Sequence, residues 1–238
     1  MTRQVQMTFM DHLVELRARL IKAGVAVLAG SIAAFFFNEW ILDLLARPFE
    51  EAVEGGKLAI FRPTEAFSLV MRLSFFGGVV LASPVILYQL WRFISPALSK
   101  RERKLVIPLM GILTVLFAGG VTLGYWALSR GLAFLLNFGG DSLQPIIGAD
   151  NYLGFAMRFI LAFGIAFEFP VFLFAAAAAG IVGSARLRQG RRWAVLIILL
   201  AAALITPSGD PLTLMLLSVP LYAMFEVTIL AIRFILKK

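Results

Sequence analysis

Two carboxylates stand among cations in the segments that carry most of the chain's positive charge. Glu15 lies within residues 12–19, and Glu102 lies within residues 99–104, where it is flanked by arginine and lysine on both sides. One interpretation is local charge balance, with Glu15 paired to Arg19 one helical turn later. The other is a receptor for a cationic ligand, because a planar guanidinium binds a carboxylate through two hydrogen bonds and two acids could hold two adjacent arginines.

A third acid, Glu168, lies about midway along an apolar run, beside Pro170. A charge at the centre of a membrane helix costs about 2.5–3.5 kcal/mol on insertion scales, so Glu168 must be protonated, hydrogen-bonded or exposed to a wet cavity. An acid at this depth indicates function by default, and a structural glutamate with satisfied oxygens is the alternative. Glu226 lies nearer the end of its run and can reach interfacial water. We expect Arg72 and Arg158 to extend towards the headgroups.

Other kinds of chemistry are excluded by composition. The chain has no cysteine and one histidine, His12, which excludes disulfides, thiolate metal sites, cysteine nucleophiles and paired histidine ligands. Phosphate-loop, dinucleotide, zinc-protease and serine-hydrolase patterns are absent. We therefore expect no cofactor, no metal and no enzymatic activity.

The composition predicts a membrane protein. Hydrophobic residues make up 61% of the chain and charged residues 15%, against roughly 25% charged in globular proteins. The net charge of +8 would favour nucleic acid as the partner of a soluble chain, but here we expect none. A membrane helix needs about 20 apolar residues. The sequence predicts an all-α polytopic protein, a single domain over residues 1–238, with spans at about 21–37, 66–91, 105–128, 152–181, 193–205 and 212–232.

Two parts of this plan are unusual. Residues 1–20 predict an amphipathic cytoplasmic helix at the headgroup level, which then turns into the membrane. The last two spans are short, and the fifth supplies only about 21 Å of helix against an apolar core of about 30 Å. Either this helix begins earlier and includes Arg191 and Arg192, or the bilayer is thinned at the turn that follows.

The distribution of charge predicts the topology. Of the 22 basic residues, 16 lie in residues 1–22, 92–104, 182–192 and 233–238, while the alternate loops hold nine of the 14 acids. By the positive-inside rule both termini are cytoplasmic. The sequence shows no internal repeat of the kind that is typical of inverted-repeat transporters. Gly120 and Gly124 have the GxxxG spacing, which in a glycine-rich span favours helix packing over dimerisation.

Together these residues resemble the TatC family, the multispan receptor subunit of the twin-arginine protein translocase. The resemblance covers nearly the whole chain, and one short motif alone would be weak. Five motifs occur in order: HLVELRAR at residues 12–19, Arg47-Pro48-Phe49, the stretch 84–102 with Tyr88, Trp91, Phe93, Pro96, Leu98 and Glu102, the stretch 163–170 with Phe163, Gly164, Phe167, Glu168 and Pro170, and a final hairpin with Thr206-Pro207, Asp210-Pro211, Pro220 and Glu226.

The resemblance implies a non-enzymatic receptor that binds the twin-arginine signal peptides of folded proteins at the cytoplasmic face. It implies single-span TatA- and TatB-type partner subunits, export driven by the proton-motive force, an oligomer within a larger complex, and a bacterial cytoplasmic (inner) membrane location with the lipid bilayer as surroundings. By motif position the signal-peptide-binding residues are Glu15, Arg17, Arg19, Phe93 and Glu102.

Further roles follow from the same resemblance. Glu168, Thr206 and Asp210 correspond to an intramembrane polar cavity that receives partner helices, and Pro48 corresponds to a structural element of the first outer loop. Many members carry a glutamine shortly after the aspartate of the last hairpin. This chain has none there, which predicts a more apolar partner contact.

Two other functions are weighed against this one. A proton-coupled transporter of small solutes could use Glu168 as its proton carrier, but it would be expected to show repeat symmetry and further buried polar residues. An intramembrane enzyme would need catalytic groups that the sequence lacks.

Overall fold

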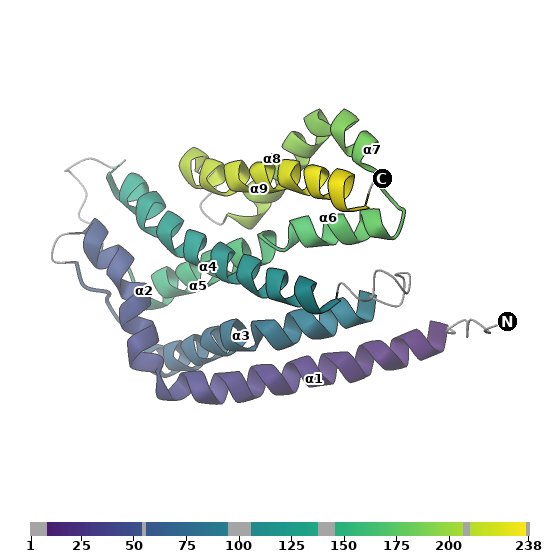
Figure 1. The fold of residues 1–238 in the computed structure, drawn as a ribbon. Coiled ribbons are helices and arrows are strands. Elements are labelled where there is room, and N and C mark those ends of the chain that lie inside the picture. The colour runs from purple at the N-terminus through teal and green to yellow at the C-terminus, as the bar shows by residue number, and fades with distance from the viewer. Residues whose placement is uncertain (1–8, 54–55, 95–105, 138–145, 207–209, 237–238) are drawn as a thin grey trace.

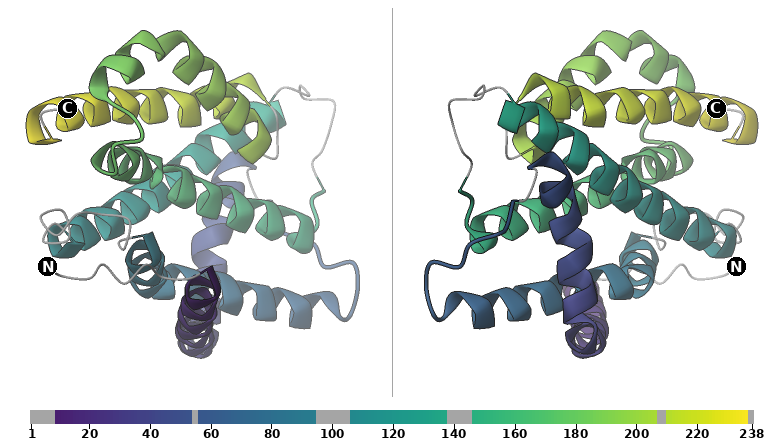
Figure 2. Two further views of the ribbon diagram at one scale, coloured as in Figure 1. Left: turned by 90° about the vertical axis from the view of Figure 1, so that its right-hand side faces the viewer. Right: turned by 90° about the vertical axis from the view of Figure 1, so that its left-hand side faces the viewer.

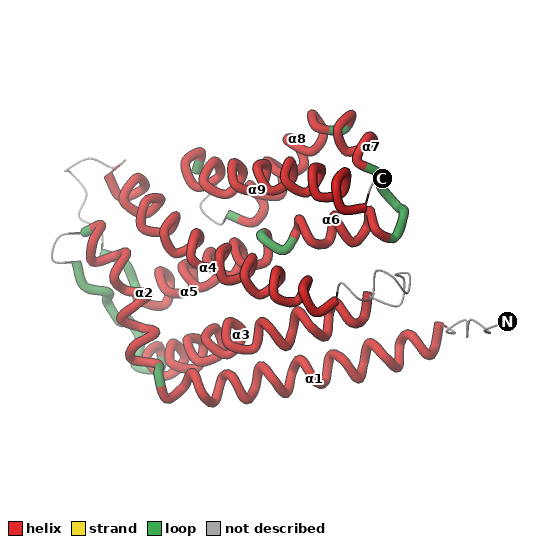
Figure 3. The backbone as a smooth tube through the Cα atoms, in the orientation of Figure 1, coloured by secondary structure: helices red, strands yellow, loops and turns green. Residues whose placement is uncertain are grey.

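The computed structural model describes residues 9–53, 56–94, 106–137, 146–206 and 210–236, and within them helices are joined by short loops (Figure 1, Figure 3). The helices are α1 (Phe9–Phe36), α2 (Asn38–Ala52), α3 (Glu65–Ile94), α4 (Val106–Asn137), α5 (Ala149–Ala166), α6 (Phe169–Ala178), α7 (Ser184–Gln189), α8 (Arg191–Ile205) and α9 (Pro211–Ala231), and a π-helical turn (Ile232–Leu236) follows α9. These described segments contain no extended strand, so the all-α prediction is confirmed.

Five stretches of the described chain are long and apolar enough to cross a membrane. They are His12–Phe36, Glu65–Phe93, Met110–Leu136, Ala149–Ala178 and Pro211–Leu236. Helix α8 begins at Arg191, so the predicted fifth span does start earlier and includes both Arg191 and Arg192. Its 15 residues still rise only about 22 Å, which is less than the apolar core of a bilayer. The count of six spans therefore stays a prediction.

The expected boundary near residue 20 is wrong, because α1 runs without interruption from Phe9 to Phe36. The physical reason is that no proline lies within this stretch, so nothing forces the amphipathic turns to separate from the apolar ones. Helix α1 packs against α3 where Gly30 meets Gly78. A Cβ on Gly78 would lie 2.6 Å from the backbone nitrogen of Ser31. Only glycine allows this close approach.

The predicted fourth span is interrupted. Helix α5 ends at Ala166 and α6 begins at Phe169, with a turn at residues 167–168. Pro170 stands in the first turn of α6, where its missing N–H leaves the carbonyl of Ala166 without a helical donor. The break therefore presents Glu168 at a helix junction inside the span.

The core lies between α1 at one edge of the molecule and the α8–α9 hairpin at the other, with α3, α4 and α5 between them (Figure 2). Large buried side chains there include Leu73, Leu128, Phe159, Phe163 and Leu217. Helices α4 and α5 approach closely, since a Cβ on Gly120 would lie 2.6 Å from the Phe163 carbonyl oxygen. The packing interpretation of the GxxxG pair is thus confirmed.

The molecule has two distinct ends (Figure 1). Helix α1 begins and the turn Ile232–Leu236 ends at one of them, which we call the terminal end. Helix α2, the segment 56–64 and the start of α5 lie at the opposite end, the loop end. Helix α2 was not expected within the first outer loop, and it runs across the direction of its neighbours. Which end faces the cytoplasm stays a prediction from the charges.

Candidate functional site

The first turns of α1 and the last turn of α3 form a site at the terminal end. Residues 12, 15 and 19 share one face of α1 because their spacing matches the helical repeat. The His12 and Phe93 rings stack with centroids 4.2 Å apart and an interplanar angle of 16°. We call His12, Glu15, Arg19 and Phe93 the α1–α3 site. It brings together two residues predicted from separate motifs, Glu15 and Phe93, through His12.

The two oxygens of Glu15 are in different situations. Arg19 donates to Oε1 from Nε at 3.0 Å and also from Nη2. Oε2 is buried and accepts no hydrogen bond from any described residue, and it lies 4.0 Å from His12 Nδ1. A buried acceptor without a donor is unfavourable, whereas a new charged donor would be strongly held. One oxygen of the carboxylate is therefore paired, and the other is buried without a donor among the described residues.

The two interpretations of Glu15 are thus compatible. The pair with Arg19 gives the local charge balance expected from the sequence, and it occupies one oxygen only. The pair is partly buried, its side chains 14% and 20% exposed, so the value of about 0.3–0.5 kcal/mol for exposed helical pairs does not apply, and a ligand that displaces Arg19 must supply a charged donor in its place. Arg17 is exposed on another face of α1. Glu102 lies outside the described residues, in the segment that leaves α3 and enters α4.

His12 is the site residue that sequence reasoning missed. It precedes Glu15 by three residues and therefore had to share its face of the helix. The signal was present in the motif, but a lone histidine in an amphipathic segment suggests a surface residue. Its partner Phe93 is far away in the sequence, so only the packing of α1 on α3 brings the two rings together.

Glu168 lies at the junction of α5 and α6 and is 2% exposed. Both of its carboxylate oxygens are buried and accept no hydrogen bond from any residue in the described segments. The expectation of a structural glutamate with satisfied oxygens does not fit this geometry. Glu168 can instead meet a polar group that comes from outside the described chain.

Thr206 and Asp210 are buried beside the α8–α9 turn, and their polar groups serve that turn. Thr206 donates from Oγ1 to the Ala202 carbonyl at 2.7 Å. Asp210 caps α9, because its Oδ1 accepts from the backbone N–H of Thr213 at 2.8 Å, and Pro211 follows in the first turn. The Thr213 hydroxyl also contacts the Asp210 carboxylate. These groups shape the hairpin.

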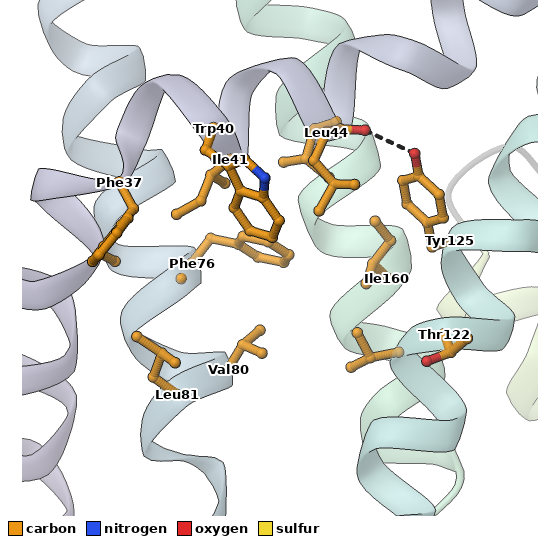
Figure 4. A pocket seen from close by; sticks show the side chains of 14 residues that line it. Phe37, Trp40, Ile41, Leu44, Phe76, Val80, Leu81, Thr122, Tyr125 and Ile160 are labelled. Carbon is orange, nitrogen blue, oxygen red and sulfur yellow. Dashed lines mark hydrogen bonds between the residues drawn. The ribbon is translucent and has the colours of Figure 1, made fainter.

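Pro48 lies inside α2 and is buried against the bundle. Proline has no N–H, so the Leu44 carbonyl, four residues earlier, lacks its helical donor. The hydroxyl of Tyr125 on α4 donates to that carbonyl at 2.9 Å (Figure 4). The hydroxyl of Tyr152 on α5 donates to the next carbonyl, that of Leu45, at 2.9 Å. Two tyrosines therefore fasten α2 to the bundle.

Beside this contact lies an apolar groove with a volume of about 750 Å³. Figure 4 shows Trp40 and Ile41 of α2, Phe76 of α3 and Ile160 of α5 directed towards it. Apart from the hydroxyls of Thr122 and Tyr125 on α4 and the indole N–H of Trp40, the side chains that line it are apolar. A groove of this kind accepts an apolar chain or helix face. Glu168 is not among the residues that line it.

Near the terminal end, α8 is tied to α9 by a polar contact. Arg191 donates from Nη2 to Glu226 Oε2 at 2.7 Å, and the Tyr222 hydroxyl donates to Glu226 Oε1 at 3.0 Å. Within the described chain no three metal-ligating side chains gather. The α1–α3 site offers carboxylate and aromatic groups for binding a ligand, and Glu15 and Phe93 are its central residues.

Comparisons with known proteins give the chain a family. The sequence model of TatC, the Sec-independent protein translocase protein, matches residues 11–220. A Sec-independent protein translocase protein TatC from Carboxydothermus hydrogenoformans is 34% identical over 233 residues, which is 98% of this chain and 95% of the relative. The corresponding protein of Aquifex aeolicus is 36% identical over 226 residues, 94% of this chain and 93% of the relative.

Solved structures agree with the sequence comparisons. A crystal structure of the twin arginine translocase receptor TatC superposes with a TM-score of 0.78 at 36% identity, covering 92% of this chain and 96% of the other. A second one, in DDM, has a TM-score of 0.81 at 36% identity over 93% of this chain and 99% of the other. The sequence match, the shared fold and the motif positions all agree: the chain belongs to the TatC family of Sec-independent protein translocase proteins.

Proposed function

We propose that this chain is the receptor subunit of a twin-arginine protein translocase and that the α1–α3 site reads the paired arginines of the signal peptide. The observation that carries the proposal is the Oε2 oxygen of Glu15, which has no donor among the described residues and lies 4.0 Å from Nδ1 of His12, whose ring stacks on Phe93. The aromatic pair lowers the local dielectric and strengthens a hydrogen bond from a charged donor. The relatives of known structure are described as twin arginine translocase receptors.

Binding would proceed by exchange of ion pairs. One guanidinium of the peptide donates to the unpaired Oε2 of Glu15 and, by displacing Arg19, to Oε1 as well, which gives the two-pronged contact. The second guanidinium pairs with Glu102, whose assignment rests on its motif position. Each charge-assisted hydrogen bond contributes about 1.5–3 kcal/mol. Lysine cannot reproduce the two-pronged contact, so the site favours arginine.

Orientation and location follow from the same proposal. Nine of the 15 basic residues in the described segments belong to the basic stretches of the sequence near the terminal end, and the positive-inside rule directs that end to the cytoplasm. Signal peptides therefore meet the α1–α3 site from the cytoplasm, with the chain in the bacterial inner membrane. No nucleotide site is needed, because export is driven by the proton-motive force.

Glu168 is our candidate contact for the single-span TatA- and TatB-type subunits. The absence of a donor for either oxygen among the described residues supports this role, since a partner helix with a polar side chain would supply one. A separate apolar groove, lined mainly by α2, α3, α4 and α5, fits the apolar face of such a helix. We assign Thr206 and Asp210 to the shape of the α8–α9 turn, which the partner would meet. The working unit is then an oligomer within a larger complex.

Peptide binding tests the receptor proposal. A fluorescent peptide with paired arginines is titrated onto the purified chain and onto Glu15→Gln and Glu102→Gln. Loss of one charged hydrogen bond predicts an affinity at least about tenfold weaker in each variant. The matched control, Glu39→Gln, removes an exposed acid from α2 and should bind as the unchanged chain does. Equal affinity for Glu15→Gln and Glu39→Gln would exclude the proposed role of Glu15.

The alternative of a proton-coupled transporter of small solutes is not supported, because the matching family and relatives are translocase proteins.

A further inference from the structure

A second cavity lies between α3 and α5, towards the loop end. We call it the α3–α5 groove. Its volume is about 730 Å³. Apolar side chains form its floor, among them Phe75, Phe76 and Leu161. Its rim is polar and carries Arg72, Asp150, Asn151 and Arg158. A smaller polar cleft of about 150 Å³ shares Arg72, Asp150 and Asn151 and extends the rim to Arg62 and Glu65, whose charges offset each other.

The two arginines of the rim differ in their partners. Arg72 donates from Nη1 to Asp150 Oδ1 at 2.5 Å and so links α3 to the start of α5. Arg158 is exposed, and its Nε donates to the Gly154 carbonyl at 2.8 Å, one turn nearer the loop end. No acid in the described segments pairs with Arg158. The groove therefore carries an unneutralised cation above an apolar floor.

The depth of these groups limits what can occupy the groove. Both α3 and α5 belong to membrane spans. Arg72 and Arg158 lie about 10 Å and about 13 Å along them from the helix starts at the loop end. A guanidinium at this depth is near the boundary between headgroups and acyl chains. A small anion would leave the apolar floor uncovered, and an apolar helix would leave Arg158 unpaired.

We propose that the α3–α5 groove binds one anionic phospholipid of the leaflet at the loop end. Its phosphodiester lies between Arg158 and Arg72, and an acyl chain covers Phe75, Phe76 and Leu161. Charge complementarity selects the anionic lipid, because Arg72 is already offset by Asp150 and Arg158 leaves one positive charge to neutralise. A guanidinium is the side chain best suited to hold a phosphate through paired hydrogen bonds. This inference is independent of signal-peptide binding.

Gly154 keeps the space beside the guanidinium open. A Cβ at this position would lie 3.8 Å from Arg158 Nη2, which is ordinary contact, so a larger side chain fits the helix but projects into the groove. Gly154→Leu therefore blocks the groove without removing charge, and Arg158→Gln removes charge without blocking the groove. Arg130→Gln is the matched control, because Arg130 is an exposed cation of α4 that lies over the Trp126 ring at 5.6 Å.

Native mass spectrometry of the delipidated full chain provides the test, with phosphatidylglycerol and phosphatidylcholine of identical acyl chains as probes. The unchanged chain and Arg130→Gln should bind one phosphatidylglycerol at least about tenfold more tightly than phosphatidylcholine. Arg158→Gln should lose this preference, and Gly154→Leu should lose the bound lipid. Circular dichroism establishes that each variant is folded. The proposal is overturned if the unchanged chain binds both lipids equally, or if either variant retains phosphatidylglycerol as tightly as Arg130→Gln does.

Discussion

The hydrogen bond from Tyr125 of α4 to Leu44 of α2 leads to a testable prediction about Pro48. Pro48 deprives the Leu44 carbonyl of its helical donor, and the Tyr125 hydroxyl replaces that donor at 2.9 Å. Removing the hydroxyl by Tyr125→Phe leaves this carbonyl unpaired. Restoring the backbone donor by Pro48→Ala should make the hydroxyl dispensable.

The expected change in the free energy of unfolding follows from the loss of this hydrogen bond. A buried acceptor that loses its donor costs about 1–3 kcal/mol, and Tyr125 is only partly buried, so we expect Tyr125→Phe to lower the free energy of unfolding by about 1–2 kcal/mol. With Pro48→Ala present, the same substitution should cost less than about 0.5 kcal/mol. The coupling between the two positions is then about 1 kcal/mol, within the range measured for residues that share a partner.

The assay is a double-mutant cycle on the purified chain in mixed micelles, with reversible unfolding by denaturing detergent followed by circular dichroism. Tyr152→Phe is the control, because its acceptor is the Leu45 carbonyl, whose position in the helical repeat faces residue 49 and not Pro48. Its cost should be the same with and without Pro48→Ala. If Tyr125→Phe also costs the same in both backgrounds, the compensation between Pro48 and Tyr125 does not exist.

Three further predictions concern other parts of the chain. Gly78→Val should lower the free energy of unfolding by more than about 2 kcal/mol, because its Cβ would meet the backbone of Ser31. Gly24→Ala is the control and should not lower it, because a Cβ at Gly24 would have nothing within 4 Å. Similar losses for the two variants would contradict the close approach of α1 and α3. Asp210→Ala should cost about 1 kcal/mol through loss of the α9 cap and Asp210→Asn much less, and no difference in thermal unfolding would refute the cap. Glu168→Leu should stabilise the isolated chain by about 1 kcal/mol or more, because it removes two buried oxygens without donors, and should abolish export in cells. A Glu168→Leu variant that is less stable than the unchanged chain and still exports would contradict the role of Glu168 as a partner contact.

The sequence predicted the membrane helices well and their boundaries less well. The apolar runs lie in helices, and the early start of α8 at Arg191 was one of two alternatives. The boundary near residue 20 failed because an amphipathic stretch and an apolar stretch share one helical period and no breaker separates them. Helix α2 was missed because charged residues and Pro48 are typical of a loop. Its stability depends on tyrosines of α4 and α5, which no local pattern reveals.

The candidate site was predictable where it is local. Glu15 and Arg19 are one turn apart on a helix, so their pairing follows from spacing. The stacking of His12 on Phe93 joins positions far apart in the sequence and depends on the packing of α1 against α3. The same limit applies to Arg72 and Asp150, which pair across two helices although they lie 78 positions apart in the sequence.

The central claim is that Glu15 reads a guanidinium, and a cycle between receptor and peptide tests it most directly. Peptides with Arg-Arg and Lys-Lys are each titrated onto the unchanged chain and onto Glu15→Gln. We predict that the change to lysine weakens binding at least about tenfold for the unchanged chain and much less for Glu15→Gln, since the two-pronged contact is already lost there. An equal loss for both proteins would show that the arginines are recognised elsewhere.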